Sequence, residues 1–319
     1  MGELQSPIRL SILDQSPITD HTDRDAAPAA SLRLARLADG LGYDRIWFAE
    51  HHNSLSFASA APDIMAAQAL AGTTRIRVGT GGILLPLSTP HRVAETMGLL
   101  QRVHGDRVDI GLGRAAFVDP AFPEHVEQVV GLLPDEFPHT TDEPAHRVWI
   151  LGVGGSSARA AGRLGTGYVQ GHFLAPGSSE GGLGAYRETV GARPVAAMLA
   201  IRAVTARNSE YAEDLARAMA LWRARKDLGR DAPVPSIRRA LHGHWTRAEH
   251  ARADGHQAGI VRGEPSVVFR RLGELARALG VNQVMINTLT SDPADREQSY
   301  ALLAEESQRV LTGQRESRD

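Results

Sequence analysis

Cysteine is absent from the 319-residue chain, which excludes disulfides, thiolate catalysis and metal sites built from cysteine ligands. Long apolar runs are also missing. The longest uncharged stretch, residues 78–90, is short and interrupted by glycine and proline, so we expect no membrane-spanning helix. Residues 1–11 lack the basic segment followed by an apolar run that marks a secretory signal. We therefore expect a cytoplasmic protein that does not bind a membrane.

Neither sign of charge is in large excess. Lys and Arg number 35 and Asp and Glu 37, a formal net charge of −2, and Lys226 is the only lysine. Nucleic-acid binding needs clustered positive charge, so we expect no nucleic-acid partner. Hydrophobic residues make up 42%, enough for a large core, and the length suits either two domains or one α/β barrel.

The most informative stretch is VWILGVGG at residues 148–155, which is followed by two serines. A short apolar run with β-branched residues gives way to glycines, and an alanine-rich helical segment begins at once. Glycines let the backbone approach a ligand, and the first N–H groups of a helix are unpaired and favour negative charge. A phosphate is therefore expected in this turn, where the candidate ligands are Gly154, Gly155, Ser156 and Ser157.

Two other interpretations of this turn stay open. A dinucleotide fingerprint would need a third glycine where Ser157 stands, and an acidic residue roughly twenty positions further on, where residues 168–171 read YVQG. Both are missing, which makes a dinucleotide site a weak hypothesis. A plain connection between a strand and a helix, with no ligand, is the simpler alternative.

Apolar runs and helical periodicity alternate along the chain without a break in composition. The predicted strands lie at residues 8–13, 45–49, 75–80, 107–112, within 148–155, and at 167–173, 194–204 and 283–288. The predicted helices lie at residues 29–41, 61–72, 89–103, 157–165, 208–226, 265–279 and 295–311, with poorly patterned loop and helix at 117–144 and no assignment for 229–263. This alternation predicts an α/β fold, a single (β/α)8 TIM barrel over residues 1–315 with a frayed tail at 316–319.

In such a barrel the active site lies at the C-terminal ends of the strands, so polar residues and glycines that directly follow strands are functional candidates. They are Asp14, Gln15, Ser16, Glu50, His51, His52, Gly81, Gly82, Gly113, Arg114, residues 153–157 and His172. Imidazole, guanidinium and backbone N–H groups would then meet at one face, a set able to bind an anion and to move a proton.

His51 is the leading catalytic candidate, because an imidazole beside Glu50 can act as a general acid or base near neutral pH. By the alternation of side chains along a strand, Glu50 should point to the opposite side from His51. The alternative is a structural histidine that caps the strand and bonds to backbone. Spacing does not separate His51 from His52.

Two interpretations of Arg114 are open. Its guanidinium can give a phosphate two parallel hydrogen bonds, or it can form an ion pair with a loop carboxylate. Gly81 and Gly82 would let a flat ring lie against the main chain, or would simply form a turn. The remaining cluster comprises His242, His244, His250 and His256. Its spacing matches no known metal site, so surface histidines are expected there and no metal.

Six segments are specific as a set, in this order and after these strands. They are LDQSP (13–17), RIWFAEHHN (45–53), RIRVGTGGILLPLSTPHRVAE (75–95), RVDIGLGRA (107–115), VWILGVGGSSARAAGRLG (148–165) and GVNQVMINTLTSDPADREQSYALLAEE (280–306). Together they resemble the bacterial luciferase-like flavin-dependent monooxygenases. The resemblance covers nearly the whole chain except residues 229–263.

The resemblance implies an enzyme that binds reduced FMN from a separate flavin reductase, reacts it with O2, and oxygenates a small organic substrate through a flavin C4a-hydroperoxide. By position, His51 corresponds to the catalytic histidine, and Arg114 and Ser157 to phosphate ligands. Gly81 and Gly82 correspond to a pair joined by a cis peptide against the flavin ring. We also expect a homodimer that pairs through helices near the first strands.

Two departures from the family pattern leave alternatives open. Serine often stands in the family where this chain has Val153 and Gly154, so backbone N–H groups would replace a hydroxyl. The segment after Arg114 is shorter than in relatives, and an exposed flavin would release H2O2 without product. The alternatives are a flavin-binding relative that has lost oxygenase activity and an oxidoreductase of the same fold that transfers hydride with F420. The sequence does not indicate the substrate.

Overall fold

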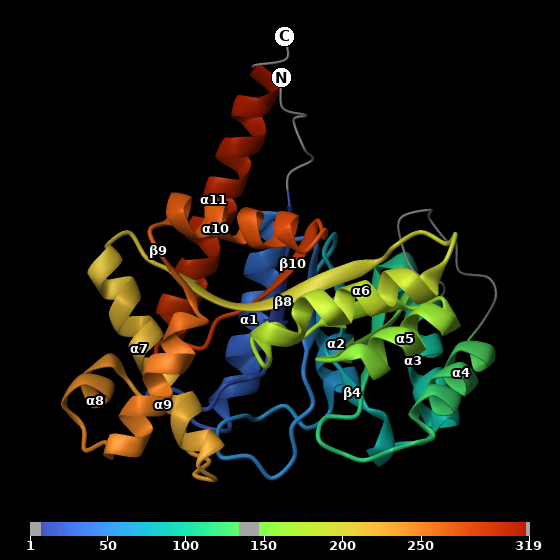
Figure 1. The fold of residues 1–319 in the computed structure, drawn as a ribbon, viewed down its shortest axis with the longest axis horizontal. Helices are drawn as coiled ribbons and strands as arrows, with labels where there is room; N and C mark the ends of the chain where they lie inside the picture. Colours follow the sequence, from blue (N-terminus) through green and yellow to red (C-terminus); the bar gives the residue numbers. More distant parts are fainter. Residues whose placement is uncertain (1–7, 134–146, 317–319) are drawn as a thin grey trace.

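The computed structural model describes residues 8–133 and 147–316, and at its centre is a closed barrel of eight parallel strands (Figure 1). The strands are β1 (Arg9–Asp14), β2 (Arg45–Phe48), β3 (Arg77–Thr80), β5 (Val108–Gly113), β6 (Val148–Gly152), β7 (Gly167–Gln170), β8 (Ala197–Thr205) and β10 (Gln283–Asn287). Neighbours in this order are hydrogen-bonded, and β10 pairs with both β8 and β1, which closes the barrel. The predicted (β/α)8 TIM barrel is confirmed.

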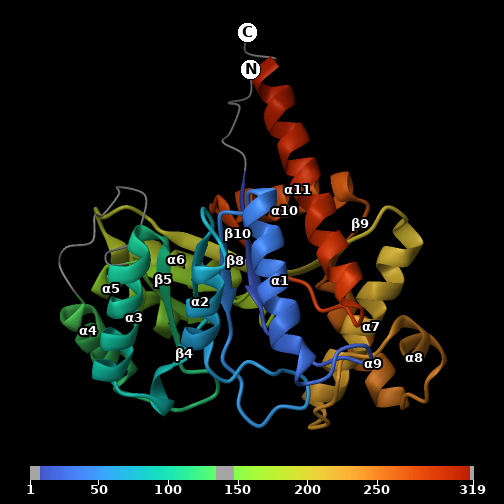
Figure 2. The same ribbon diagram turned by 180° about the vertical axis from the view of Figure 1, so that it is seen from behind.

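Helices cover the outside of the barrel. They are α1 (Ala26–Leu41), α2 (Pro62–Ala71), α3 (Pro90–His104), α4 (Phe122–Leu132), α5 (Gly155–Leu164), α6 (Ser179–Val190), α7 (Ser209–Asp227), α10 (Pro265–Ala278) and α11 (Pro293–Glu316). Figure 1 shows α6 and α10 in front of the strands, and Figure 2 shows α1, α2 and α11 in front from the opposite side. Within the described ranges, no helix has the length and apolar character that crossing a membrane requires.

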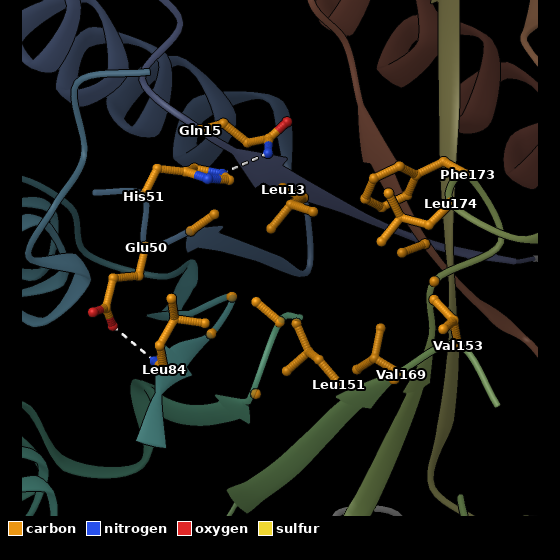
Figure 3. A pocket seen from close by; sticks show the side chains of 18 of the residues that line it. Leu13, Gln15, Glu50, His51, Leu84, Leu151, Val153, Val169, Phe173 and Leu174 are labelled. Carbon is orange, nitrogen blue, oxygen red and sulfur yellow. Dashed lines mark hydrogen bonds between the residues drawn. The ribbon is translucent and has the colours of Figure 1, made fainter. Parts of the chain in front are cut away.

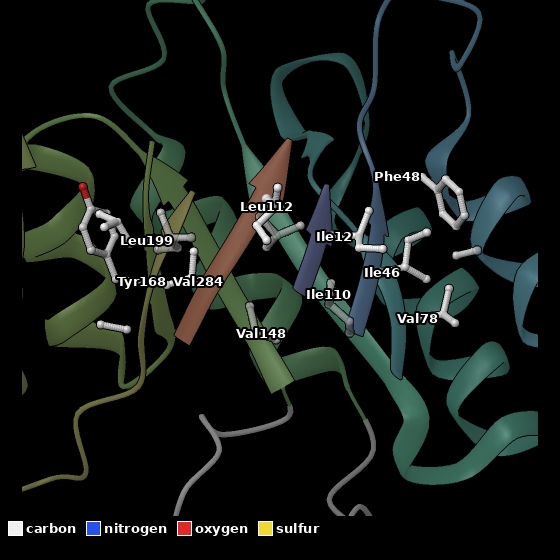
Figure 4. Packing of buried hydrophobic residues seen from close by; sticks show 14 of the residues in the cluster. Ile12, Ile46, Phe48, Val78, Ile110, Leu112, Val148, Tyr168, Leu199 and Val284 are labelled. Carbon is white, nitrogen blue, oxygen red and sulfur yellow. The ribbon is translucent and has the colours of Figure 1, made fainter. Parts of the chain in front are cut away.

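The alternation of side chains along each strand separates two cores. Ile12, Ile46 and Val78 share one paired register on β1, β2 and β3 and face the helices, in the cluster that Figure 4 shows. One position further along, Leu13 and Trp47 belong to a second cluster inside the barrel. Both faces of the strands are therefore buried, which explains why they read as nearly continuous apolar runs.

Large residues stand beside small ones inside the barrel. Trp149 on β6 is paired with Gly167 on β7, where a Cβ would come within 2.3 Å of the indole. Trp47 and Trp149 meet edge to face, with ring centres 5.8 Å apart. The two indoles occupy the barrel interior, and a cavity lies at the C-terminal ends of the strands.

A charged cluster that the sequence did not indicate lies in the same interior. The fully buried carboxylate of Asp109 on β5 accepts hydrogen bonds from Arg77 Nη2 (2.5 Å), Arg45 Nη1 (3.3 Å) and Trp47 Nε1 (3.0 Å). Burial acts to raise the pKa of Asp109, but the positive charges of Arg77 and Arg45 outweigh it and hold the pKa below its usual value. The cluster is therefore ionised, and each charge in it depends on the others.

Three segments differ from the prediction. Helix α6 was not predicted, because three glycines between 181 and 184 hide its helical pattern. Residues 229–263, left unassigned, contain α8 (Ile237–His242), α9 (Arg247–Ala258) and strand β9 (Val261–Gly263), which pairs with the end of β8. A short strand β4 (Ile83–Leu84) pairs with β5. Polar helices such as α9 carry little apolar periodicity, so their sequence is hard to read.

Some predicted boundaries shift, and some lie outside the described residues. Helix α5 begins at Gly155, two residues before the predicted start. Helix α11 continues to Glu316, beyond the predicted end at 311, and the rest of the predicted frayed tail, 317–319, lies outside the described residues. The poorly patterned segment contains α4, and its remainder at 134–144 also lies outside them.

Candidate active site

A cavity of about 420 Å³ opens at the C-terminal ends of the strands, within the usual range for small-molecule sites. It is lined by many of the residues singled out from the sequence: Gln15, Glu50, His51, Gly81, Gly82, Gly113, Arg114, Val153, Gly154, Ser156 and Ser157. Asp14, Ser16, His52, Gly155 and His172 do not line it. Residues that follow five different strands are thus brought to one place, as the barrel topology requires.

His51 lies partly buried in one wall of the cavity. Gln15 donates from Nε2 to Nε2 of the imidazole at 2.8 Å (Figure 3). The imidazole ring stacks on Phe57 with ring centres 4.3 Å apart. Burial first, and then the positive charge of Lys226, lowers the pKa of His51 from 6.5 to about 4. The imidazole is therefore neutral at pH 7. The reference pKa on which the sequence argument relied does not apply at this position.

Glu50 and His52 form a separate pair beside His51. Glu50 accepts a hydrogen bond from His52 Nε2 at 2.5 Å and another from the backbone N–H of Leu84 at 2.8 Å. Strand β2 ends at Phe48, so its alternation does not extend to these residues. Figure 3 shows Glu50 and His51 pointing in different directions, although both line the cavity. Because His52 lies outside the cavity lining, the structure separates the two histidines.

The turn between β6 and α5 offers an anion site. Helix α5 has Gly154 as its N-cap, with no side-chain cap for its first N–H groups. Arg114 reaches this turn from the end of β5 and donates from Nη2 to Ser156 Oγ at 3.2 Å. Among the described residues Arg114 forms no ion pair with a carboxylate, so the ion-pair interpretation has no partner residue there. Unpaired N–H groups, a helix N-terminus and a guanidinium together favour a phosphate.

Gly155 takes a different position from its neighbours in this turn. A Cβ there would come within 2.9 Å of Arg159 Nη1, so Arg159 covers the space beside it. Gly155 can therefore contribute its backbone N–H to the first turn of α5 without lining the cavity. Arg159 itself does not line the cavity.

Gly81 and Gly82 are joined by a cis peptide, as the family resemblance implied. A Cβ at Gly81 would lie 2.6 Å from Leu13 Cδ1, and one at Gly82 would lie 2.8 Å from the carbonyl oxygen of Gly111. Packing against backbone therefore demands glycine at Gly82, whereas a side chain at Gly81 would require Leu13 to shift. Both residues line the cavity beside apolar side chains, which Figure 3 shows for Leu13, Leu151 and Val169. This wall suits a flat, apolar ring.

A basic and aromatic side of the cavity was missed from the sequence. It consists of Phe57, Phe173, Arg202, Trp222, Arg223 and Lys226. Arg202 interrupts the otherwise apolar strand β8, and this was the one signal that pointed to it. The three residues of α7 lie in a helix whose sequence is polar enough to be read as a surface helix.

The histidine cluster of the unassigned region does not form a metal site within the described residues. His250 and His256 bond instead to side chains of α7: His250 Nδ1 to Arg217 at 3.0 Å, and His256 Nε2 to Asp227 at 2.7 Å. These hydrogen bonds help to hold α9 against α7.

Comparison with known proteins adds a family to this geometry. Residues 8–283 match the family model described as luciferase-like monooxygenase. The uncharacterized protein YceB of Bacillus subtilis is 35% identical, with 93% of this chain and 99% of that protein covered. A protein of Escherichia coli named luciferase-like monooxygenase is 29% identical, with 95% and 98% covered. The crystal structure of apo-MsnO8 superposes with a TM-score of 0.81 at 30% identity, covering 94% of this chain and 98% of that one.

Proposed function

Because the chain belongs to the luciferase-like monooxygenase family, we propose that it oxygenates a small organic substrate with O2 and reduced FMN, which a separate flavin reductase supplies. Bound reduced FMN contributes two electrons, so that one oxygen atom of O2 enters the substrate and the other leaves as water. The observation that carries the proposal is the convergence of the anion-binding turn, the apolar wall and a partly buried, neutral histidine on one cavity.

The residues present fit FMN. The unpaired N–H groups of α5 and the guanidinium of Arg114 suit its phosphate, and the apolar wall beside Gly81 and Gly82 suits its ring. Among solved structures of the same fold, a Baeyer-Villiger monooxygenase from Pseudomonas putida is in complex with FMN, at 16% identity and a TM-score of 0.68. An F420-dependent secondary alcohol dehydrogenase has the same TM-score at 12% identity. The fold alone therefore admits either cofactor.

The chain's own residues have separate tasks in this proposal. Arg114 and the first turn of α5 hold and orient the cofactor, while Leu13, Leu151 and Val169 exclude water from the reacting face. His51, neutral and held at Nε2 by Gln15, can give a proton from Nδ1 during oxygen transfer, and it takes one up at Nε2 by giving up the hydrogen bond from Gln15.

The cofactor is tested by the effect of ligands on unfolding. FMN at about 100 times its dissociation constant should raise the free energy of unfolding by about 2.7 kcal/mol, and NADPH should give no increase. Arg114→Ala should weaken FMN by about 10- to 100-fold, because a hydrogen bond to a charged group contributes about 1.5–3 kcal/mol. Riboflavin, which has no phosphate, should bind the variant as it binds the native chain. Thermal unfolding measures the stabilisation by FMN and NADPH. Calorimetric titration measures the affinities of the native chain and the variant for FMN and riboflavin.

The control is Arg33→Ala, at an exposed arginine of α1, which should change neither affinity. Protection by F420 or NADPH without protection by FMN would contradict the proposed cofactor. Equal losses of FMN and riboflavin in Arg114→Ala would remove Arg114 from the phosphate site.

A homodimer is proposed from the surface of α2 and α3. Ile64 on α2 is 61% exposed, and Leu99 and Val103 on α3 are 59% and 65% exposed. Large apolar side chains exposed on neighbouring helices are consistent with an interface at this surface. Light scattering at micromolar concentration should give twice the chain mass of 34.3 kDa. Leu99→Glu should give the single-chain mass, whereas Leu241→Glu on α8 should leave the dimer intact. A native chain that scatters as 34.3 kDa would contradict the proposal.

A further inference from the structure

Arg202 is a buried cation with an incomplete set of partners. It lies on β8, is 4% exposed and lines the cavity. Its Nε and Nη2 both donate to Oδ1 of Asn287, at 3.4 and 3.3 Å, and Asn287 is itself oriented by a hydrogen bond from Nδ2 to the carbonyl of Leu13. The other guanidinium nitrogen, Nη1, has no acceptor among the described residues.

Two aromatic rings hold the guanidinium in place. Its central carbon lies 5.1 Å from the ring centre of Phe173 and 5.5 Å from that of Trp222. Trp222 is fixed in turn by a hydrogen bond from Nε1 to Ser56 Oγ at 2.9 Å. Cation–π contacts offset part of the cost of burial but do not neutralise the charge. Arg202 is thus positioned, and its charge remains available to a ligand.

The carboxylates near this side of the cavity are already engaged. Asp227 pairs with Arg223 at 2.8 Å, and Asp231 pairs with Lys226 at 2.8 Å. Among the described residues that line the cavity, Glu50 is the one carboxylate, and it bonds to His52 and Leu84. Burial first, and then the charge of Arg223, lowers the pKa of Arg202 to about 9, so the guanidinium is still charged at pH 7. A buried charge without a counter-ion is costly, and an anionic ligand would remove that cost.

We propose that Arg202 binds a carboxylate of the substrate, so that the oxygenase acts on small organic acids. This proposal rests on the proposed function for the reaction and goes beyond it by naming the substrate class. Arg202 lies on β8, whereas the phosphate turn lies between β6 and α5 and takes its arginine from β5, so the two anions have separate sites. A single free Nη1 above an apolar wall of Leu13, Ala200 and Met285 suits a monoanion with an apolar body.

The test compares two probes of equal size and different charge. Phenylacetate and phenylacetamide are titrated calorimetrically into the FMN-loaded protein. The native chain should bind phenylacetate about 10- to 100-fold more tightly, the effect of one charge-assisted hydrogen bond. Arg202→Met should lose this preference while FMN affinity stays within about twofold. Arg217→Met, an arginine of α7 that faces α9, should keep both.

The following results of these titrations would contradict the proposal. Equal affinities of the two probes for the native chain would overturn it, even if Arg202→Met fails to fold. A variant that keeps the preference would overturn it as well. If Arg202→Met weakens FMN and leaves the probes unchanged, the guanidinium serves the cofactor. The same titrations on cofactor-free protein separate the two proposals, because FMN can fail to bind while the preference for the carboxylate persists.

Discussion

Replacing His51 with alanine is expected to lower product formation by roughly 10²-fold or more, the usual scale for a lost acid–base group, while FMN affinity stays unchanged. The imidazole lies in the cavity wall formed after β2, whereas the phosphate turn lies between β6 and α5. The residue proposed for proton transfer and the residues proposed for cofactor binding therefore lie in different parts of the cavity wall. The measurement uses externally reduced FMN and a substrate that the native chain oxygenates, with product and H2O2 quantified together.

The pH dependence follows from the lowered pKa of His51. With a folded pKa of about 4, the imidazole stays neutral from about pH 5 upward, so its contribution to product formation should fall only as the pH approaches 4. The free energy of unfolding should also decrease as the pH falls. Between pH 6.5 and 4 the unfolded chain binds this proton and the folded chain does not, so acidification destabilises the native chain across that window. His51→Ala should lack this component.

Two further variants serve as controls for the His51→Ala prediction. His52→Ala should have a smaller effect, because His52 bonds to Glu50 and does not line the cavity. Gln15→Ala should retain part of the activity, since it removes the partner that orients the imidazole and leaves the imidazole itself. A His51→Ala protein with normal product yield would show that the histidine is structural, and the proton transfer would have to be assigned to another group.

Asp109→Ala should destabilise the protein by about 3–5 kcal/mol, because it removes one charge from a buried ionic cluster. Arg45, which is fully buried, would lose one of its carboxylate partners, and Trp47 Nε1 would lose its acceptor. Such a change in the free energy of unfolding is large beside the total stability of a domain. Urea denaturation of the cofactor-free protein measures it from the shift of the midpoint at constant slope.

The matched control removes a carboxylate from the surface. Glu274→Ala breaks an exposed pair with Arg270 on α10 and should cost less than about 0.5 kcal/mol. If Asp109→Ala and Glu274→Ala had the same effect, the buried cluster would contribute nothing beyond an ordinary surface pair. Asp109→Asn, which keeps the shape and the acceptor for Trp47, should fall between the two.

The strands could be read from the sequence because both of their faces are buried. Ile46 faces the helices and Trp47 faces the interior, so β2 is apolar at successive positions and stands out from its surroundings. Helices α6 and α9 could not be read in this way. Glycines weaken the pattern of α6, and α9 is held by polar contacts such as His250 to Arg217, which leave no apolar period. Long-range polar contacts have no local signature.

The same distinction applies to the site. Residues that directly follow strands could be placed at the mouth by topology alone, and His51, Arg114 and Ser156 do line one cavity. The pKa of His51 could not be predicted, because it depends on burial and on Lys226, which is distant in sequence. Trp222 was missed for a similar reason. Which face of α7 points toward the cavity depends on how the helix packs against the rest of the protein. The sequence of the helix alone does not predict this packing.

One carboxylate acts as a reversible cross-link in a chain that has no cysteine. Asp231 accepts hydrogen bonds from Ser54 Oγ (2.8 Å), the backbone N–H of Leu55 (2.7 Å), Ser56 Oγ and Lys226 Nζ (2.8 Å). Burial acts to raise the pKa of Asp231, but the bond from Lys226 and those from residues 54–56 outweigh it and hold the pKa far below its usual value. Acid that protonates the carboxylate would weaken these bonds. At ordinary pH they join the loop that follows His51 to α7, the helix whose Trp222 packs on Arg202.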